Sequence, residues 1–216
     1  NIGSREGEPA GTAGAVIDLA AREAAARAVM ETPEWKTAAE KPADAARDTS
    51  KQAGYGSLEW QAARRYVTAD GQEIIGFDAA VDHLVAEAGA LVPGGVARER
   101  KAYIVIGYPG AGKTSIADAL RSTFRAARVV GDDAKLIIPE YDGGQNNGGV
   151  KRESDRLAAA TAAQLASNGA NLILETSGTQ AGVEGRVAEL KAKGYSVALV
   201  HIATPKVVAM EQAVAR

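Results

Sequence analysis

Residues 103–114 read Tyr-Ile-Val-Ile-Gly-Tyr-Pro-Gly-Ala-Gly-Lys-Thr, and this stretch decides the fold of the chain. Its first four residues are an apolar run with the length of a buried strand, and the sequence from Lys113 to Phe124 is typical of a helix. Residues 107–114 satisfy the pattern G-x-x-x-x-G-K-[ST], which between a strand and a helix is a phosphate-binding P-loop. An incidental glycine-rich turn is the alternative, but it leaves the flanking strand and helix unexplained.

The chemistry of phosphate binding accounts for the residues of the P-loop. Glycines let the backbone wrap so that successive N–H groups point at one phosphate, and the helix that follows directs the positive end of its dipole at the same anion. Lys113 reaches the β- and γ-phosphates, and the Thr114 hydroxyl ligates Mg²⁺. We therefore predict ATP or GTP and Mg²⁺ as cofactors, with the nucleotide bound by Gly107, Tyr108, Pro109, Gly110, Ala111, Gly112, Lys113, Thr114 and Ser115.

Downstream of the P-loop, strand and helix patterns alternate. We expect strands at 128–130, 171–174 and 196–202, helices at 151–167 and 183–193, a last helix that opens at Pro205, and a glycine-rich loop at 143–149. This alternation implies parallel strands joined by right-handed crossovers, and fully apolar strands imply a sheet covered on both faces. The predicted fold class is therefore α/β: a P-loop kinase-type, three-layer α/β/α domain with a parallel sheet.

Upstream of the P-loop, the sequence predicts a small helical region. Helical periodicity covers 13–30, 58–66 and 78–91, with Ser57 as a cap and with Val81, Leu84, Val85 and Ala88 on one face of the last helix. Trp60 and Tyr66 are expected on the buried side of the middle helix. Pro93-Gly94-Gly95 ends the pattern, so we place a helical N-terminal region at 1–97 and a second domain at 98–216.

Composition narrows the classes of function. The 216 residues carry a net charge of −2, so no global attraction to nucleic acid or to an anionic membrane is expected. The chain has no cysteine and no apolar stretch long enough to cross a bilayer, and no signal peptide is visible; we expect a cytoplasmic protein without disulfides. His83 and His201 have no partners at ligand spacing, so both are interpreted as structural.

Two acidic residues follow predicted strands. Ligands of open parallel sheets bind beyond the carboxyl ends of the strands, and Asp132 and Glu175 lie at such ends. A carboxylate there can hold magnesium or take the proton from an attacking hydroxyl. Helix capping is the alternative for Asp132 and Asp133, whereas Glu175, after four apolar residues, has little structural reason to be acidic. No Asn-Lys-x-Asp segment of the GTPase kind is present, so a phosphotransferase is favoured.

Four blocks of residues resemble the zeta-toxin family of P-loop kinases. They are 107–114, 132–141 (Asp-Asp-Ala-Lys-Leu-Ile-Ile-Pro-Glu-Tyr), 172–178 (Leu-Ile-Leu-Glu-Thr-Ser-Gly) and 193–195 (Lys-Gly-Tyr), and the similarity covers about 100–216. The best-known bacterial members phosphorylate UDP-N-acetylglucosamine. The resemblance implies an ATP-dependent kinase, acting as a toxin, that transfers the γ-phosphate to a hydroxyl of this nucleotide-sugar or a related metabolite.

The resemblance also assigns roles. It implies Asp132, Lys113 and Arg216 as catalytic residues, with Asp132 taking the proton and Arg216 matching the first of two lid arginines. Asp132, Ser154, Glu175 and Ser177 match substrate-binding positions, and Thr114 and Glu175 the metal site. The second lid arginine would lie beyond Arg216, so we expect the kinase domain to be truncated at its C-terminus.

Two departures leave the acceptor open. Where the family has an acidic and a basic acceptor-contacting residue, this chain has Ala159 and Gln180. Another acceptor (NAD, a nucleoside, a drug or a protein) and a nucleotide-binding regulatory module without turnover remain alternatives. A helical antitoxin blocks the nucleotide site in toxin systems, so residues 1–97 are interpreted as an antitoxin-like segment in cis, or else as a scaffold or delivery region with any antitoxin acting in trans.

Overall fold

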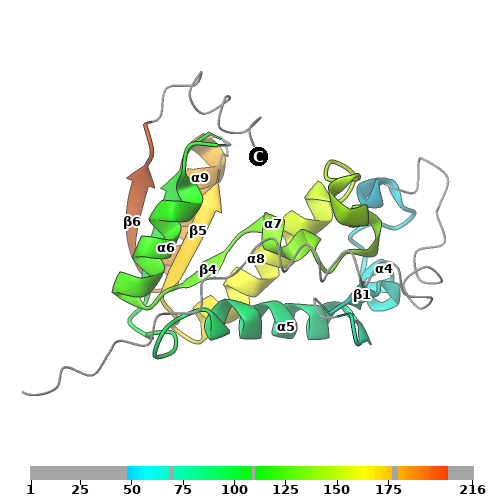
Figure 1. Cartoon of the computed structure of the whole chain (residues 1–216), viewed down its shortest axis with the longest axis horizontal. Coiled ribbons are helices and arrows are strands. Elements are labelled where there is room, and N and C mark those ends of the chain that lie inside the picture. Colours follow the sequence, from blue (N-terminus) through cyan, green and yellow to red (C-terminus); the bar gives the residue numbers. More distant parts are fainter. Residues whose placement is uncertain (1–47, 69–70, 109, 177–179, 204–216) are drawn as a thin grey trace, which may run out of the picture.

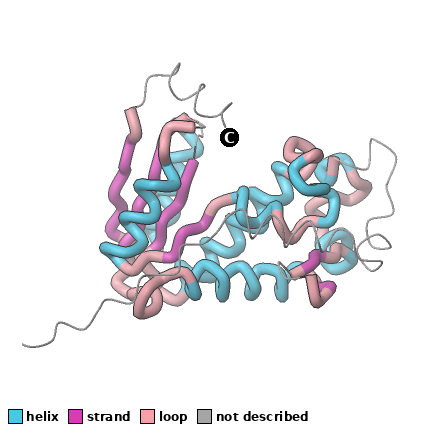
Figure 2. Tube along the Cα trace, in the orientation of Figure 1, coloured by secondary structure: helices cyan, strands magenta, loops and turns pink. Residues whose placement is uncertain are grey.

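The computed structural model describes residues 48–68, 71–108, 110–176 and 180–203 (Figure 1). The predicted helices at 13–30 and after Pro205 lie outside these ranges. Within them, the chain forms a four-stranded sheet with helices packed on it. A second group of helices and two short strands lies beside the sheet, and Figure 2 colours both groups by element type.

The sheet contains β3 (Lys101–Ile106), β4 (Ala127–Val129), β5 (Leu172–Thr176) and β6 (Ser196–His201). Its order is β4-β5-β3-β6, and every neighbouring pair is parallel. The register places Ile104 of β3 beside Leu174 of β5 and Leu199 of β6. The central position of β3 and β5 explains why their sequences are continuous apolar runs.

Helices cover both faces of the sheet. On one face, α6 (Lys113–Phe124) packs Ala117 against Val105 and Ile173. The other face is covered by α8 (Lys151–Ser167), α9 (Gln180–Ala192) and α5 (Phe77–Ala90), whose Leu165, Leu190 and Ala88 share a core with alternate strand residues. The predicted three-layer α/β/α fold with a parallel sheet is therefore confirmed.

The strongest sequence signals gave the most accurate boundaries. The helices α6 and α8 begin and end where the periodicity predicts, and Gly194 ends the turn after α9 in the left-handed conformation, with a φ of +79°. Helix α9 begins at Gln180, three residues before its predicted start. The predicted strands differ from the observed ones by at most two residues at either end.

The region before α5 differs more from its prediction. The 3₁₀ helix η1 (Thr49–Lys51) precedes α4 (Leu58–Ala63), in which Ser57 accepts the N–H of Trp60 as predicted. The helix predicted to reach Tyr66 ends at Ala63, and a hairpin of β1 (Tyr66–Val67) and β2 (Ile74–Ile75) follows. Arg64 leaves the helical conformation, with ψ at 140°, and its side chain enters an ion-pair network described below.

Helix α5 shares hydrophobic cores with the elements that follow it. Val81 and Leu84 pack in one cluster with Ile137 and Leu157, and Ala88 lies in the core beneath the sheet. The predicted apolar face of α5 therefore covers elements downstream of residue 97. Burial of this face therefore stabilises the packing of α5 on the sheet and on the helices that follow it.

The segment between β4 and α8 folds as α7 (Gly131–Lys135), the 3₁₀ segment η2 (Pro139–Gly144) and a series of turns. Neither α7 nor η2 was predicted from the sequence. The glycine-rich stretch belongs to these turns, and Asn146 donates from its side-chain amide to the carbonyl of Glu140 at 2.8 Å. Across the described residues, no helix has both the length and the apolar character needed to cross a membrane.

Candidate active site

The P-loop connects the end of β3 to α6, as its sequence predicts. Gly110 and Gly112 have φ values of +80° and +86°, a region that side chains other than glycine rarely adopt. A Cβ at Gly107 would lie 3.3 Å from the Cβ of Ala111 and 3.5 Å from the Cγ of Lys113. The loop is thus wound tightly enough that glycine is favoured by conformation at Gly110 and Gly112, and a side chain at Gly107 would fit only if its neighbours shifted slightly.

Lys113 folds back over the loop it follows. Its Nζ donates to the carbonyl oxygens of Gly107 at 2.9 Å and Tyr108 at 3.0 Å. Thr114 is half-buried and Ser115 exposed in the first turn of α6. These contacts hold the ammonium group against the loop, where a bound phosphate would meet backbone N–H groups and a helix N-terminus.

The carboxyl edge of the sheet brings the predicted acidic residues to the same side of the molecule as the P-loop. The N–H of Gly107 donates to the carbonyl of Thr176 at 3.3 Å, so the end of β5 lies directly beside the start of the P-loop. Glu175 pairs in register with Val105 of β3. On the other side of β5, β4 leads through Val130 into α7, whose first turn carries Asp132 and Asp133.

Asp132 is the most exposed of these carboxylates. Its side chain is 79% exposed, and its Oδ1 accepts from the Nζ of Lys135 at 2.6 Å. Lys135, by contrast, is buried, and its Nζ also contacts the Oδ1 of Asn147 from the glycine-rich stretch. An exposed carboxylate held at one oxygen is suited to accept a proton from a bound hydroxyl.

Glu175 has a different environment. Its side chain is only 4% exposed, and its Oε1 contacts the Nε of Arg128 on β4. Arg128 also reaches the Oδ2 of Asp133 at 3.3 Å through Nη1. Burial alone lowers the pKa of the Arg128 guanidinium, but the charges of Asp133 and Glu175 outweigh it, and the pKa lies above its ordinary value. Arg128 is therefore a permanent cation that holds Glu175 in place.

Of the remaining residues singled out from the sequence, some lie in described elements and others lie outside the described ranges. Ser154 is fully buried at the start of α8, and its Oγ donates to the carbonyl of Lys151 at 2.9 Å, which gives it a structural partner. Ala159 is exposed on α8, and Gln180 begins α9. Three predicted residues lie outside the described ranges: Pro109, Ser177 and Arg216. Among the described residues, no cluster of three or more His, Asp or Glu side chains is arranged to hold a metal.

Sequence reasoning missed both cations of the site, Arg128 and Lys135. Each carried a signal that was available in the sequence. Arg128 interrupts the apolar strand before two aspartates, and Lys135 follows Asp132 by three residues, the spacing of neighbours on a helix. Because α7 was not predicted, the second spacing could not be interpreted.

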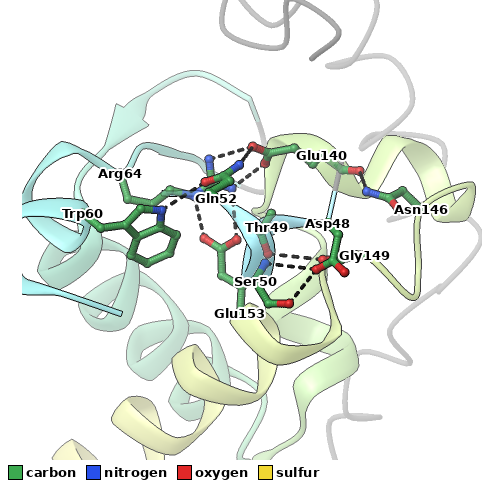
Figure 3. Close-up of polar contacts among 10 residues, drawn as sticks. All are labelled: Asp48, Thr49, Ser50, Gln52, Trp60, Arg64, Glu140, Asn146, Gly149 and Glu153. Atoms are coloured by element: carbon green, nitrogen blue, oxygen red, sulfur yellow. Dashed lines mark hydrogen bonds and ion pairs between the residues drawn. The ribbon is translucent and has the colours of Figure 1, made fainter. Parts of the chain in front are cut away.

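A second polar network joins the N-terminal elements to α8 and η2 (Figure 3). Arg64 donates from Nε to Glu153 Oε1 at 2.6 Å and from Nη1 to Glu140 Oε1 at 2.9 Å. The side chain of Glu153 is fully buried, and those of Arg64 and Glu140 are 11% exposed. Burial alone lowers the pKa of Arg64, but the hydrogen bond to Glu140 and the charge of Glu153 raise it above its ordinary value.

A family comparison decides what kind of protein contains this site. The sequence model of the zeta-toxin family, described as "Zeta toxin", matches residues 95–216, more than half of the chain. The chain belongs to the zeta-toxin family. The match spans every strand of the sheet, the P-loop and α7, so the site described above lies within the family's domain.

A solved structure of a toxin–antitoxin system has a similar fold. A chain from a structural study of the PezAT chromosomal toxin–antitoxin system of Streptococcus pneumoniae superposes with a TM-score of 0.55 at 23% identity, covering 64% of this chain and 60% of that one. This zeta-toxin chain thus spans less than two thirds of the PezAT chain. A Chloroflexus aurantiacus protein provisionally assigned as a kinase gives a TM-score of 0.43 at 22% identity, covering 55% of this chain and 68% of that one. No curated protein sequence matches.

Proposed function

We propose that this chain is an ATP-dependent phosphotransferase that moves the γ-phosphoryl group to a hydroxyl of a small metabolite. The observation that carries the proposal is the shared sheet edge. There the wound P-loop, closed by Lys113, lies beside the end of β5, and the exposed carboxylate of Asp132 follows the neighbouring strand β4. A phosphate site alone would serve any nucleotide-binding protein, whereas an exposed carboxylate that follows a strand at the same edge of the sheet supports transfer to a hydroxyl.

The residues of the loop fit a nucleoside triphosphate with Mg²⁺. The glycines leave the backbone open to a phosphate, and the half-buried Thr114 in the first turn of α6 is the proposed metal ligand. When bound, the metal neutralises charge on the phosphate oxygens. Glu175 is the second proposed metal or substrate residue. Because Arg128 occupies Oε1, Glu175 would act through its other oxygen, Oε2.

Different residues of the chain have different proposed roles in the transfer of the phosphoryl group. Lys113 and the loop N–H groups bind and orient the phosphates, and the N-terminus of α6 adds its dipole. Asp132 accepts the proton of the acceptor hydroxyl. Arg216, carried over from the family resemblance, is proposed to place a further positive charge against the transferring group.

The acceptor and the biological role follow from the family. We propose a nucleotide-sugar such as UDP-N-acetylglucosamine as acceptor, contacted by Asp132, Ser154, Glu175 and Ser177, and a toxin acting in the cytoplasm. The departures at Ala159 and Gln180 fall at acceptor positions, so a panel of acceptors is part of the test.

The likeness to a toxin–antitoxin system supports an antitoxin partner for this chain as well. Residues 1–97 are the proposed site of inhibition in cis. Since α5 shares a core with the sheet and Arg64 pairs with Glu140 of η2 and Glu153 of α8, a test should remove residues 1–47 and retain 48–97. Higher kinase activity of the shortened chain would support inhibition in cis, and unchanged activity would assign the partner to a separate molecule.

The function is tested by ATP consumption with a panel of acceptors: nucleotide-sugars, NAD, nucleosides and protein. We expect one acceptor to stimulate consumption by the wild-type chain, and Asp132→Asn to reduce that stimulation by about 10²–10⁴-fold while nucleotide affinity is retained. Nucleotide binding without turnover on any acceptor would instead identify a regulatory binding module. Turnover by Asp132→Asn at the wild-type rate would remove Asp132 from the role of base.

A further inference from the structure

Lys135 lies between the proposed base and the glycine-rich stretch. Its Nζ is 2.6 Å from Oδ1 of Asp132, three residues earlier on α7, and it also contacts Oδ1 of Asn147. The side chain of Lys135 is 6% exposed, whereas that of Asp132 is 79% exposed. The cation is therefore buried beneath a carboxylate that faces outward.

This arrangement differs from every other lysine ion pair within a described helix or turn. Lys51, Lys151 and Lys193 pair with carboxylates three or four residues away, and their side chains are 70%, 58% and 38% exposed. Such surface pairs keep both groups in water and contribute about 0.3–0.5 kcal/mol each. Burying an ammonium group costs desolvation free energy, and an ion pair with an exposed carboxylate recovers little of it. The pair therefore contributes little to the stability of the fold.

The geometry suits the control of a carboxylate's orientation. An ammonium group has three donors and no acceptor. Two of its directions are used by Asp132 and Asn147, and these contacts fix Oδ1 of the carboxylate. Among the described residues, Oδ2 of Asp132 has no hydrogen-bond partner, so it is the oxygen presented outward. A base held at one oxygen presents the other in a defined direction to a hydroxyl.

We propose that Lys135 is the positioning residue of this active site: it holds Asp132 by Oδ1 so that Oδ2 faces the acceptor hydroxyl, and Asn147 fixes Lys135 in turn. The proposal rests on the proposed phosphotransferase function. It also links the glycine-rich stretch to the base, so the conformation of residues 143–149 bears on the rate of transfer.

The test compares Lys135→Met with the wild type on an acceptor that supports turnover. We expect kcat to fall by about 10²-fold, as for a misplaced catalytic group, with the KM for ATP unchanged because the P-loop is untouched. Lys135→Arg keeps a cation at this position and should recover much of the loss. Lys193→Met removes a lysine that follows α9 and forms an exposed pair with Glu189, and it should leave kcat unchanged. Met fills most of the space of the lysine stem, and water can solvate the exposed carboxylate of Asp132 once Lys135 is gone, so the melting temperature should shift little.

A double-mutant cycle distinguishes positioning from a general structural role. If Lys135 acts through Asp132, then Lys135→Met added to Asp132→Asn has no further effect on turnover. Independent, multiplicative losses, or wild-type kcat for Lys135→Met, would overturn the inference while leaving the function intact. A wild-type chain without acceptor-dependent turnover would overturn the proposed function itself, and the positioning role with it.

Discussion

Two regions of this molecule, named after their proposed roles, are built by different means: the phosphate half is β3 to α6, and the acceptor half is residues 48–90 and 127–157 with Glu175. The phosphate half, β3 to α6, takes its site from one continuous stretch, and Lys113 bonds to carbonyls five and six residues away. In the acceptor half, side chains far apart in sequence meet as buried ions. Arg64 pairs with carboxylates 76 and 89 residues later, and Arg128 pairs with Glu175, 47 residues later.

This difference separates what the two halves contribute. Local backbone geometry is enough to bind a phosphate, a group common to all nucleoside triphosphates. Long-range ion pairs fix η2 and the start of α8 relative to the N-terminal elements, and Arg128 links β4 to Asp133 of α7. This is the side that carries Asp132 and the proposed acceptor positions. The comparison predicts that substitutions in the phosphate half impair activity without unfolding, whereas those at the long-range ion pairs of the acceptor half reduce stability.

The largest expected loss of stability follows from Arg64→Met. This change leaves the buried carboxylates of Glu153 and Glu140 without their cation, and breaking a buried pair in this way costs about 3–5 kcal/mol. Chemical denaturation should show this as a lower midpoint with a similar slope. Arg65→Met, at the exposed neighbouring arginine, is the control and should change the midpoint little. Equal midpoints for both variants would refute a structural role for the network.

Lys113→Ala should produce the largest loss of activity that leaves the fold intact. Removal of one preorganised donor from a charged site costs about 10²–10³-fold in rate. The half-buried lysine donates to two carbonyl oxygens of its own loop, and circular dichroism and the denaturation midpoint should stay close to wild type. Lys193→Ala, with an exposed side chain, is the matched control for both measurements. A large fall in the midpoint would contradict the separation of the two halves.

The acceptor half should also respond to alkaline pH through Tyr66, which is fully buried. Burial raises the pKa of its hydroxyl, and the charge of Glu153 raises it further. The folded chain therefore keeps the phenolic proton at pH values where the unfolded chain has lost it. The resulting contribution to the free energy of unfolding is constant below pH about 10 and falls above it, by up to about 1.4 kcal/mol per pH unit. Tyr66→Phe should flatten the loss of stability measured between neutral and strongly alkaline pH. An identical slope in the variant would show that Tyr66 does not titrate in this range.

The smallest effect is expected at the N-cap of α4. Ser57 accepts the N–H of Trp60 at 3.1 Å, and Ser57→Ala should cost about 1 kcal/mol in thermal or chemical denaturation. Ser122→Ala, which removes an exposed hydroxyl on α6, is the control. If the cap variant were as stable as wild type, α4 would contribute little to the network that Arg64 extends from its C-terminus.

The two halves also differ in how far the sequence predicts them. The pattern around Gly107 and Lys113 predicts strand, loop, helix and ligand together, because every determinant is local. The apolar runs at β3 and β5 likewise predict a sheet covered on both faces. Asp132 was predicted from its place after a strand, since the carboxyl ends of parallel strands share an edge.

Long-range pairing explains what the sequence could not predict. No local pattern connects Arg64 to Glu153, so neither the end of α4 at Ala63 nor the following hairpin could be predicted. The partner of Glu175 was missed for the same reason, because Arg128 lies on a neighbouring strand that is distant in sequence. Lys135 was accessible only through α7, a helix of five residues whose sequence has no strong helical periodicity.

The central claim is the transfer of a phosphoryl group to a small-molecule hydroxyl, and mass spectrometry of the product tests it most directly. The purified chain is incubated with ATP labelled in the γ-phosphoryl group and a bacterial metabolite extract, in parallel with Asp132→Asn. The account predicts one metabolite that gains a labelled phosphoryl group with the wild-type chain and not with the variant. A wild-type reaction that releases only labelled inorganic phosphate, or consumes no ATP at all, would contradict it.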